Sequence, residues 1–159
     1  MRFRAHDTFF IRKGWLYKGM KNVVLDETVF MGDKGNPMDI LGIGANMVKA
    51  LRYWLQAVGL TSEPTSGKRY QTLTPFGDMV FKYDKYIEEI GTLCFLHYKL
   101  ATNVSDATAW YYFFNEFNHN EFTKDDFVKQ LNTYIILNGS EVSERSLEDD
   151  FNCIINTYV

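Results

Sequence analysis

The chain has 159 residues, enough for one domain or two small ones that share a core, and its 46% hydrophobic and 23% charged residues are typical of globular proteins. Its apolar runs are too short to cross a bilayer and its first residues form no signal peptide, so we expect a cytoplasmic protein that does not enter a membrane. The two cysteines, Cys94 and Cys153, fall within helical patterns, which favours buried thiols over a disulfide.

Charge is distributed unevenly along the chain, although the net charge is only −3. Residues 1–56 contain nine Lys or Arg against five Asp or Glu, residues 57–85 contain four against three, and residues 86–159 contain four against twelve. A polyanion such as DNA would therefore meet only the first half of the chain. Because no strongly basic patch is present, we expect the affinity for duplex DNA to be modest and sensitive to salt.

The first forty residues predict two helices separated by a turn-rich segment. Residues 8–21 have a helical pattern, and Thr8 is the expected N-cap. Residues 22–36 are mixed in character and rich in turn-forming residues, and Pro37 suits the first turn of a short helix that follows them.

A longer helix within residues 41–60 is entered through a Gly-x-Gly turn and has two distinct faces. Its apolar side chains recur with the helical period and predict a buried face. The opposite arc carries donors, two cations and an aromatic ring: Asn46, Lys49, Arg52, Tyr53 and Gln56. A helix-turn-helix presents such an arc to the major groove; the alternative is a core helix whose outer face is merely solvated.

The order of elements after this helix favours a winged helix. Residues 61–67 form a polar loop, and residues 68–73 alternate as a short strand. A helix followed by a turn-linked strand pair is the winged-helix order, so we expect Lys68 and Arg69 near the wing and near DNA. The predicted fold class is mainly α: a winged-helix-like N-terminal part with a short β-hairpin, followed by an all-α helical bundle.

The second half of the chain is predicted to be helical. Thr74 and Pro75 start one helix, and residues 86–101 are apolar almost all round, as in a central buried helix. Three further helices have N-caps and apolar stripes: residues 106–117 after Ser105 or Asp106, a helix capped by Thr123 with Asp126, and a helix capped by Ser146 with Asp149.

Composition divides the chain near Asp84. Residues 1–84 form the predicted DNA-binding part, and residues 85–159 form an acidic, aromatic-rich helical part. Because the last predicted helix reaches Val159 without a stop signal, we expect the chain to be cut short at its C-terminus.

Candidate catalytic residues are few. The sequence contains no Walker lysine loop, no Gly-x-Ser-x-Gly elbow and no paired zinc cysteines. His6 is followed by Asp7 and lies near Arg12 and Lys13 in the sequence. A histidine and a carboxylate beside cations can activate water and hold a phosphate, as in a nuclease. The alternative is a capping and salt-bridging cluster at the start of the first helix.

A second acidic group consists of Asp84, Glu88 and Glu89. Carboxylates gathered at a helix start can recruit a divalent metal ion. The helix dipole also explains a carboxylate-rich first turn, and it is the preferred explanation. No residue is therefore assigned as a metal ligand.

Five stretches resemble motifs of one family, and their spacing is kept over nearly the whole chain. Phe3-Arg-Ala-His-Asp-Thr-Phe9 resembles the family pattern Phe-x-Gly-His-Glu-Thr-Phe. The other four are Arg12-Lys-Gly-Trp-Leu-Tyr-Lys-Gly19, Leu41-Gly-Ile-Gly-Ala-Asn-Met-Val-Lys-Ala-Leu-Arg-Tyr-Trp54, Thr92-Leu-Cys-Phe-Leu-His97 and Ala107-Thr-Ala-Trp-Tyr-Tyr-Phe-Phe-Asn115. The family is domain of unknown function number 4007, which includes the B component of the single-strand DNA phosphorothioation (Ssp) antiphage systems of bacteria.

The resemblance implies a DNA-binding component of a defence system of the restriction-modification kind. Its implied partners are DNA, a cysteine desulfurase, an ATP-pyrophosphatase-type sulfurtransferase and an ATPase. It also implies that single-strand nicks are made for sulfur insertion. For such an endonuclease Mg²⁺ and Mn²⁺ are the candidate cofactors, with no ligands assigned. Family members are longer than this chain.

Three departures from the family pattern limit what can be carried over. Ala5 replaces the motif glycine and Asp7 its glutamate, so a catalytic role for His6 and Asp7 carries over only in part. Ala45 stands where the family usually has lysine, which removes a phosphate contact at the helix entrance. Two hypotheses remain: a DNA-engaging, nicking component, or a non-catalytic winged-helix adaptor or protein-interaction module of the same machinery.

Overall fold

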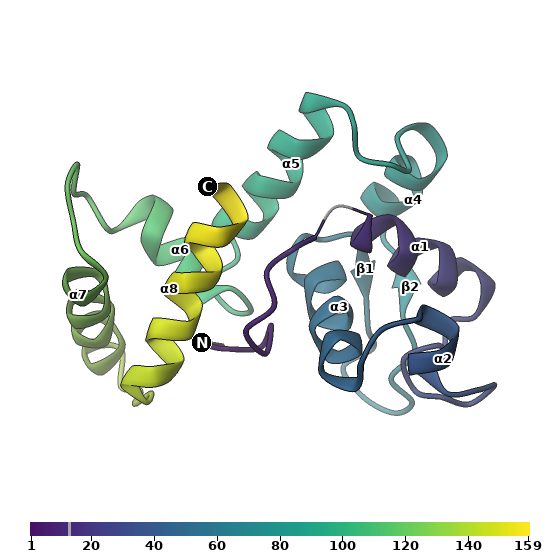
Figure 1. Ribbon diagram of the computed structural model, residues 1–159, viewed down its shortest axis with the longest axis horizontal. Coiled ribbons are helices and arrows are strands. Elements are labelled where there is room, and N and C mark those ends of the chain that lie inside the picture. The colour runs from purple at the N-terminus through teal and green to yellow at the C-terminus, as the bar shows by residue number, and fades with distance from the viewer. Residues whose placement is uncertain (13) are drawn as a thin grey trace. The chain divides into compact units, whose positions relative to one another are not determined.

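The computed structural model describes residues 1–12 and 14–159, and in them the chain is mainly helical with one small antiparallel sheet (Figure 1). The coarse fold class predicted from the sequence is thereby confirmed. In chain order the elements are α1 (Trp15–Leu25), α2 (Pro37–Leu41), α3 (Ala45–Ala57), β1 (Thr61–Ser62), β2 (Thr72–Leu73), α4 (Pro75–Tyr83), α5 (Ile90–Ala101), α6 (Thr108–Asn115), α7 (Lys124–Leu137) and α8 (Glu144–Tyr158).

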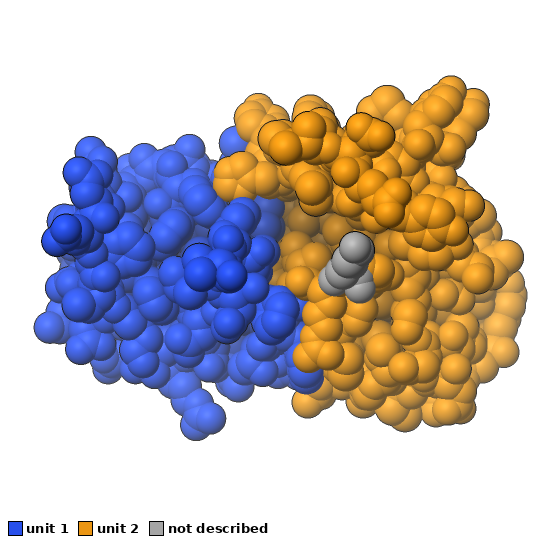
Figure 2. Space-filling model, turned by 45° about the horizontal axis from the view of Figure 1, so that its top comes forward, with its two compact units in different colours: residues 1–10, 100–159 blue, residues 11–99 orange. Residues whose placement is uncertain are grey.

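The chain forms two compact units, coloured separately in Figure 2. The first unit joins residues 1–10 to residues 100–159, and the second contains residues 11–99. The compositional boundary near Asp84 falls inside the second unit. The functional division at that residue, into a DNA-binding and an acidic part, stays a prediction.

The unit of residues 11–99 is built around α3. The apolar face of this helix is buried as the periodicity predicts, and Leu51, Trp54 and Leu55 have no exposed surface. Helices α1, α2 and strand β1 pack against α3. Strand β1 pairs with β2 in antiparallel register, with Thr61 opposite Leu73. The two ends of the loop between β1 and β2 therefore lie side by side, and its β1 end packs against α3.

Helix α4 begins where Thr74 and Pro75 predict. The Thr74 hydroxyl donates to the carbonyl of Gly59 at 2.6 Å and accepts from the N–H of Gly77 at 3.0 Å, so it ties the end of α3 to the start of α4. Gly77 is needed there, because a Cβ on it would lie 1.9 Å from the carbonyl oxygen of Leu60.

The unit of residues 1–10 and 100–159 has its own core between α6, α7 and α8. Its fully buried members include Trp110, Phe127, Leu131, Ile135 and Leu147. Helix α7 begins with the capping box of Thr123 and Asp126, as predicted. Among the described residues, none of the helices has both the length and the apolar character needed to span a membrane.

Three helix starts, besides that of α5, differ from the sequence prediction. Helix α6 begins at Thr108 after Ala107, which has no side-chain cap bond, so neither Ser105 nor Asp106 is its N-cap. Helix α1 begins at Trp15, and Thr8 has a left-handed φ of 70° instead of capping a helix from residue 8. Helix α8 is capped by Ser143, whose side chain accepts from the N–H of Ser146, so the helix starts one turn before the predicted cap. At α8, Ser143 accepts from a backbone N–H one turn before the predicted cap, so the helix begins earlier. At α1, residue 8 still lies in an irregular segment, so the helix begins later.

The prediction of a central buried helix at residues 86–101 is wrong. Helix α5 is shorter, and most of its side chains are exposed, including Ile90 and Leu93. Cys94 on this helix is an exposed free thiol, whereas Cys153 on α8 is buried as expected. Burial raises the pKa of the Cys153 thiol. An apolar surface all round a helix therefore need not mean that the helix is enclosed.

Candidate nucleic-acid interface

The α2–turn–α3 segment presents an open helix start. The side chain of Asn36 caps α2 by accepting from the N–H of Met38 at 3.0 Å. Gly42 ends α2 with a left-handed φ of 62°, and the extended Gly44 precedes α3 without a side chain to cap it. The first N–H groups of a helix have no partner within the helix and attract anions.

Asn46 and Lys49 lie on the exposed side of this helix start. They are three residues apart, so their side chains share one face of α3. Among the described residues, Lys49 has no carboxylate within ion-pair distance. The amide and the ammonium are therefore both available to a ligand at the N-terminal end of α3.

Arg52 and Gln56, one and two turns further on, are engaged within the protein. The Arg52 guanidinium binds the Glu63 carboxylate in a fork, with Nε 2.5 Å from Oε1 and Nη2 2.9 Å from Oε2. Gln56 donates to the same carboxylate at 3.1 Å, and so does Gln71. These bonds fasten the loop between β1 and β2 to α3.

The Glu63 side chain is only 11% exposed, and its partners favour the ionised form of its carboxylate. Burial raises the pKa of Glu63, but the hydrogen bonds from Arg52 and Gln71 together with the nearby charges of Arg52 and Arg69 lower it more. The pKa therefore ends below its ordinary value of 4.5. Arg52 is neutralised by a carboxylate that stays charged.

Tyr53 does not belong to the exposed face. Its side chain is buried, at 4% exposure, and its ring centroid lies 5.0 Å from that of Trp54. The helical angle alone assigns it to the polar arc, but neighbouring elements cover that part of α3. Of the five residues of the arc, Asn46 and Lys49 are open, Arg52 and Gln56 are paired, and Tyr53 is in the core.

The remaining cations of the candidate interface lie on loops. Lys68 and Arg69 are exposed in the loop between β1 and β2, and Lys68 is ion-paired with Asp33. Arg12 is exposed, with its guanidinium carbon 5.4 Å from the centre of the Trp15 ring. Lys13 lies outside the described residues.

His6 is buried in the other unit, and its partner is Asp150. The Nε2 atom lies 2.6 Å from Oδ1 of Asp150, and Nδ1 accepts from the N–H of Thr8 at 3.1 Å. The ring also packs edge-on against Trp110 at 5.6 Å. Asp7 is half-buried with a left-handed φ of 48°. Because His6 has no exposed surface and both its nitrogens have partners, this conformation gives a phosphodiester no access to it.

Asp150 is the residue of this cluster that sequence reasoning missed. Its Oδ1 also accepts from the N–H of Arg4 at 2.9 Å, while the Arg4 side chain pairs with Asp149 at 2.7 Å. Burial raises the pKa of Asp150, and the bond with His6 opposes that rise. One signal could have found it: Asp150 is three residues after Leu147 and four before Ile154, so it lies on the buried stripe of α8.

The acidic group around Asp84 caps the start of the segment that leads into α5. The Asp84 carboxylate accepts from the N–H groups of Glu88 at 2.9 Å and Glu89 at 3.2 Å. The bond from Glu88 is the main reason that the pKa of Asp84 lies below its usual value. Within the described part of the chain, no three His, Cys, Asp or Glu side chains converge in a way that could hold a metal ion.

A comparison with protein-family models identifies one family that matches the chain. The family model described as "Protein of unknown function (DUF4007)" matches residues 3–159. The chain belongs to the DUF4007 family. The resemblance drawn from the five sequence stretches is therefore confirmed. Among curated proteins, none matches the chain.

The DUF4007 chain is also similar to solved structures of SspB. The SspB crystal structure is 30% identical with a TM-score of 0.89, and the magnesium ion-bound SspB crystal structure is 31% identical with a TM-score of 0.87. Each comparison covers 99% of this chain and 49% of the SspB chain. The DUF4007 chain thus spans about half the length of these structures.

Proposed function

We propose that this chain is the DNA-contacting part of an SspB-like component of a DNA phosphorothioation defence system. The observation that carries the DNA contact is the open start of α3, where Asn46 and Lys49 lie exposed beside an uncapped helix N-terminus. The likeness to SspB over 99% of the chain supports the choice of system. The implied partners are DNA and the sulfur-transfer proteins of such a system.

We further propose that residues 11–99 work as a winged helix. The order α1, α2, Gly-x-Gly turn, α3, β1, loop and β2 supports it, as does the antiparallel pairing of β1 with β2. In this proposal α3 enters the major groove by its N-terminal end. The loop of residues 63–71 is the wing, where Lys68 and Arg69 meet phosphates.

The residues of the polar arc then have different roles. Lys49 contacts a phosphate and Asn46 a phosphate or a base edge. Arg52 and Gln56 act as positioning residues, because their bonds to Glu63 hold the wing against α3. With few cations in reach, the affinity is modest and falls steeply with salt.

A test compares Lys49→Ala and Asn46→Ala with the parent chain, using fluorescence anisotropy on a labelled duplex between about 50 and 200 mM salt. We expect Lys49→Ala to weaken binding several-fold, to the same extent for all DNA sequences. The slope of log K against log salt concentration should fall in magnitude by about one. We expect Asn46→Ala to weaken binding with a slope close to that of the parent.

Lys129→Ala, an exposed lysine on α7 in the other unit, is the matched control and should bind like the parent. Arg52→Ala is a poor test, because it leaves the Glu63 carboxylate without its main partner and loosens the fold. If Lys49→Ala and Asn46→Ala both bind as the parent does, α3 is not the DNA face.

The second candidate is a non-catalytic adaptor that docks partner proteins. It is favoured by the acidic second half and by the paired state of Arg52 and Gln56. Salt-sensitive duplex binding by the parent chain speaks for the first candidate, and its absence for the adaptor. Nicking by His6 and Asp7 remains a separate prediction, tested by relaxation of supercoiled plasmid in Mg²⁺ or Mn²⁺. The burial of His6 gives it no support.

A further inference from the structure

The wing, residues 63–71, is held at both of its ends. At the first end, the Glu63 carboxylate is bound by Arg52 of α3. At the second end, the N–H of Gln71 donates to the carbonyl of Glu27 at 2.9 Å. The buried side chain of Gln71 also donates to the Glu63 carboxylate at 3.1 Å, which joins the two ends to each other. A loop fixed in this way presents its tip in one position, so less entropy is lost when the tip binds a ligand.

The tip of the wing is a tight turn. Gly67 has a left-handed φ of 81°, and the N–H of Tyr70 donates to the carbonyl of Lys68 at 3.0 Å. A bond between residues two positions apart closes a γ-turn, so Arg69 lies at its centre. Lys68 is itself paired with Asp33. Arg69 and Tyr70 therefore follow one another on an exposed turn of defined shape.

Tyr70 differs from the other tyrosines of the chain in its surroundings. Each of the other nine contacts an aromatic ring, a lysine ammonium or a carboxylate. Tyr70 is 39% exposed, and among the described residues its ring has no such partner and its hydroxyl has no hydrogen bond. A tyrosine side chain has apolar faces and a polar tip, and at this position both are available to a ligand.

The surroundings of Tyr70 favour DNA as that ligand. Arg69 beside it is exposed, and within the described part of the chain it has no carboxylate at ion-pair distance. Arginine side chains enter narrow minor grooves, and tyrosine side chains contact sugars and phosphates. The wing is bonded to Arg52, which lies one turn beyond Lys49 on α3. If α3 enters a major groove, the wing tip reaches the DNA backbone beside it.

We propose that Tyr70 is a DNA-contact residue whose ring packs on a deoxyribose at the edge of the minor groove. Its hydroxyl donates to a phosphate, and Arg69 enters the groove. This role rests on the proposed function, because it takes α3 as the helix in the major groove. It adds a contact that carries no charge, and it assigns the tip of the wing to the minor groove.

Anisotropy titrations of the whole chain on a labelled, A·T-rich duplex separate the contacts by their salt dependence. We expect Tyr70→Ala to weaken binding about five- to ten-fold. The slope of log K against log salt concentration should not change, because Tyr70 neutralises no phosphate charge. Tyr70→Phe keeps the ring and should weaken binding about two- to three-fold. Arg69→Ala should lower the magnitude of the slope by about one.

Netropsin, a small molecule that fills the minor groove of A·T tracts, supplies the second readout. At saturating netropsin the parent chain should bind the same duplex several-fold more weakly, because the wing tip is shut out of the groove. The double variant Tyr70→Ala with Arg69→Ala should lose much less, because its wing tip no longer uses the groove. Lys49→Ala should respond to netropsin as strongly as the parent.

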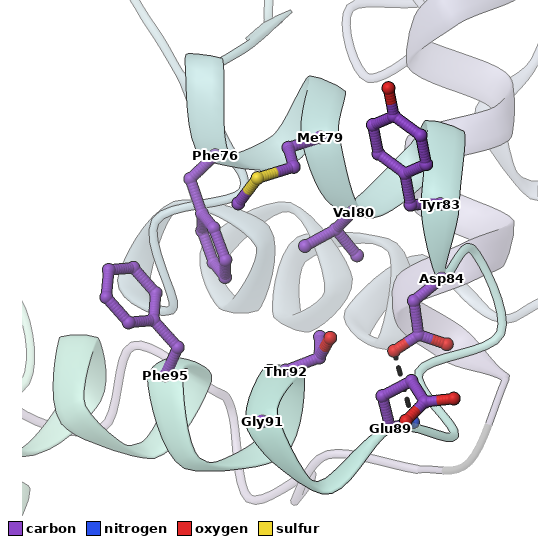
Figure 3. Close-up of a pocket in the computed structure, with 9 residues that line it drawn as sticks. All are labelled: Phe76, Met79, Val80, Tyr83, Asp84, Glu89, Gly91, Thr92 and Phe95. Carbon is purple, nitrogen blue, oxygen red and sulfur yellow. Dashed lines mark hydrogen bonds between the residues drawn. The ribbon is translucent and has the colours of Figure 1, made fainter.

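Tyr83→Ala is the matched control. Tyr83 is 75% exposed in the same unit and lines the mainly apolar pocket between α4 and the start of α5, outside the wing (Figure 3). Its affinity, salt slope and response to netropsin should equal those of the parent. Thermal unfolding checks the fold of each variant. If Tyr70→Ala is unfolded at the assay temperature, Tyr70→Phe decides by its affinity.

The outcomes separate the role of Tyr70 from the proposed function. If Lys49→Ala weakens binding but neither Tyr70 variant does, the role of Tyr70 is wrong and the proposed function stands. If the Tyr70 variants weaken binding but Lys49→Ala and Asn46→Ala do not, Tyr70 contacts DNA and α3 is not the DNA face. A parent chain that binds no duplex overturns both. Equal losses to netropsin in the parent and in the double variant overturn the minor-groove contact.

Discussion

Arg52 illustrates how the role of a single residue depends on its partner. From the sequence it is a cation on the polar face of a helix, which is a natural phosphate contact. In the fold its guanidinium faces a carboxylate eleven positions away, and both groups are mostly buried. A pair of this kind sets the position of the loop between β1 and β2 relative to α3. Lys49 has no such carboxylate among the described residues and retains its charge for a ligand.

The lowered pKa of Glu63 leads to a pH-dependent prediction. An acid that ionises more easily in the folded chain stabilises the fold above its ordinary pKa of 4.5, and this stabilisation is lost as the pH falls through the lower value. We expect Glu63→Gln to reduce the free energy of unfolding by about 2 kcal/mol at pH 7. The difference from the parent should shrink below pH 4.5.

The measurement is urea unfolding in a Trp110→Phe background, so that fluorescence reports Trp15 and Trp54 in the same unit as Glu63. Glu121→Gln, an exposed loop residue, is the control and should stay within about 0.5 kcal/mol of the parent at each pH. A difference that is the same at pH 7 and at about pH 3.5 would show that ionisation of Glu63 is not its cause.

His6 and Asp150 mark the limit of local sequence reasoning at this scale. The pair is separated by 144 positions, so nothing near His6 in the sequence points to its partner. Asp7, the adjacent carboxylate, is the partner that the local sequence suggests. Periodicity predicts that Asp150 is buried on α8. It does not predict that the partner is His6, because only the fold brings the two residues together.

At the scale of elements, what the sequence predicts well is what is settled locally. The cap of Thr74 before Pro75 and the capping box of Thr123 with Asp126 are both confirmed, because each needs only four neighbouring residues. The predicted start of α1 is wrong because residues 1–10 belong to the other unit. The predicted burial of α5 is wrong because the apolar character of a helix does not show what surrounds it.

Gly77 gives a prediction about how two elements meet. Gly77→Ala should lower the free energy of unfolding by about 2 kcal/mol or more, because its Cβ would overlap the Leu60 carbonyl at 1.9 Å and α4 must move. Gly91→Ala, on α5 with open space around its Cβ, is the matched control and should stabilise by roughly 0.5 kcal/mol.

Urea unfolding of both variants, followed by the tryptophans of residues 11–99, checks the pair. Equal stability of Gly77→Ala and the parent would mean that the contact between α4 and the end of α3 is looser than the structure shows.

At the scale of the whole molecule, the two units share the chain in an interleaved way. The first ten residues and the last sixty belong together, and residues 11–99 lie between them. Charge and composition indicate a boundary near Asp84, because they depend only on the amino acids of each segment. They do not show that residues 1–10 pack with residues 100–159. The interleaving depends on the bonds from Arg4 and His6 to Asp149 and Asp150 on α8, and these contacts cannot be predicted from composition.

Removal of residues 1–10 tests this division. It deletes the bonds from Arg4 and His6 to Asp150, leaving a buried carboxylate without these two partners. We expect the amides of α6 and α8 to exchange with solvent at least about ten-fold faster, as followed by hydrogen-exchange mass spectrometry. The amides of α3 should keep the parent's rates and serve as the internal control. Equal loosening of α3 and α8 would contradict the division into two units.

The buried bond between His6 and Asp150 also fixes an order of events on the ribosome. Residues 11–99 can complete their core while the rest of the chain is still being made, because all its members lie within that segment. The first ten residues leave the ribosome before any of them, yet their partner is translated 144 positions after His6. They remain unpaired until α8 has been made, so residues 1–10 find their place only after residues 11–99 have had the opportunity to fold.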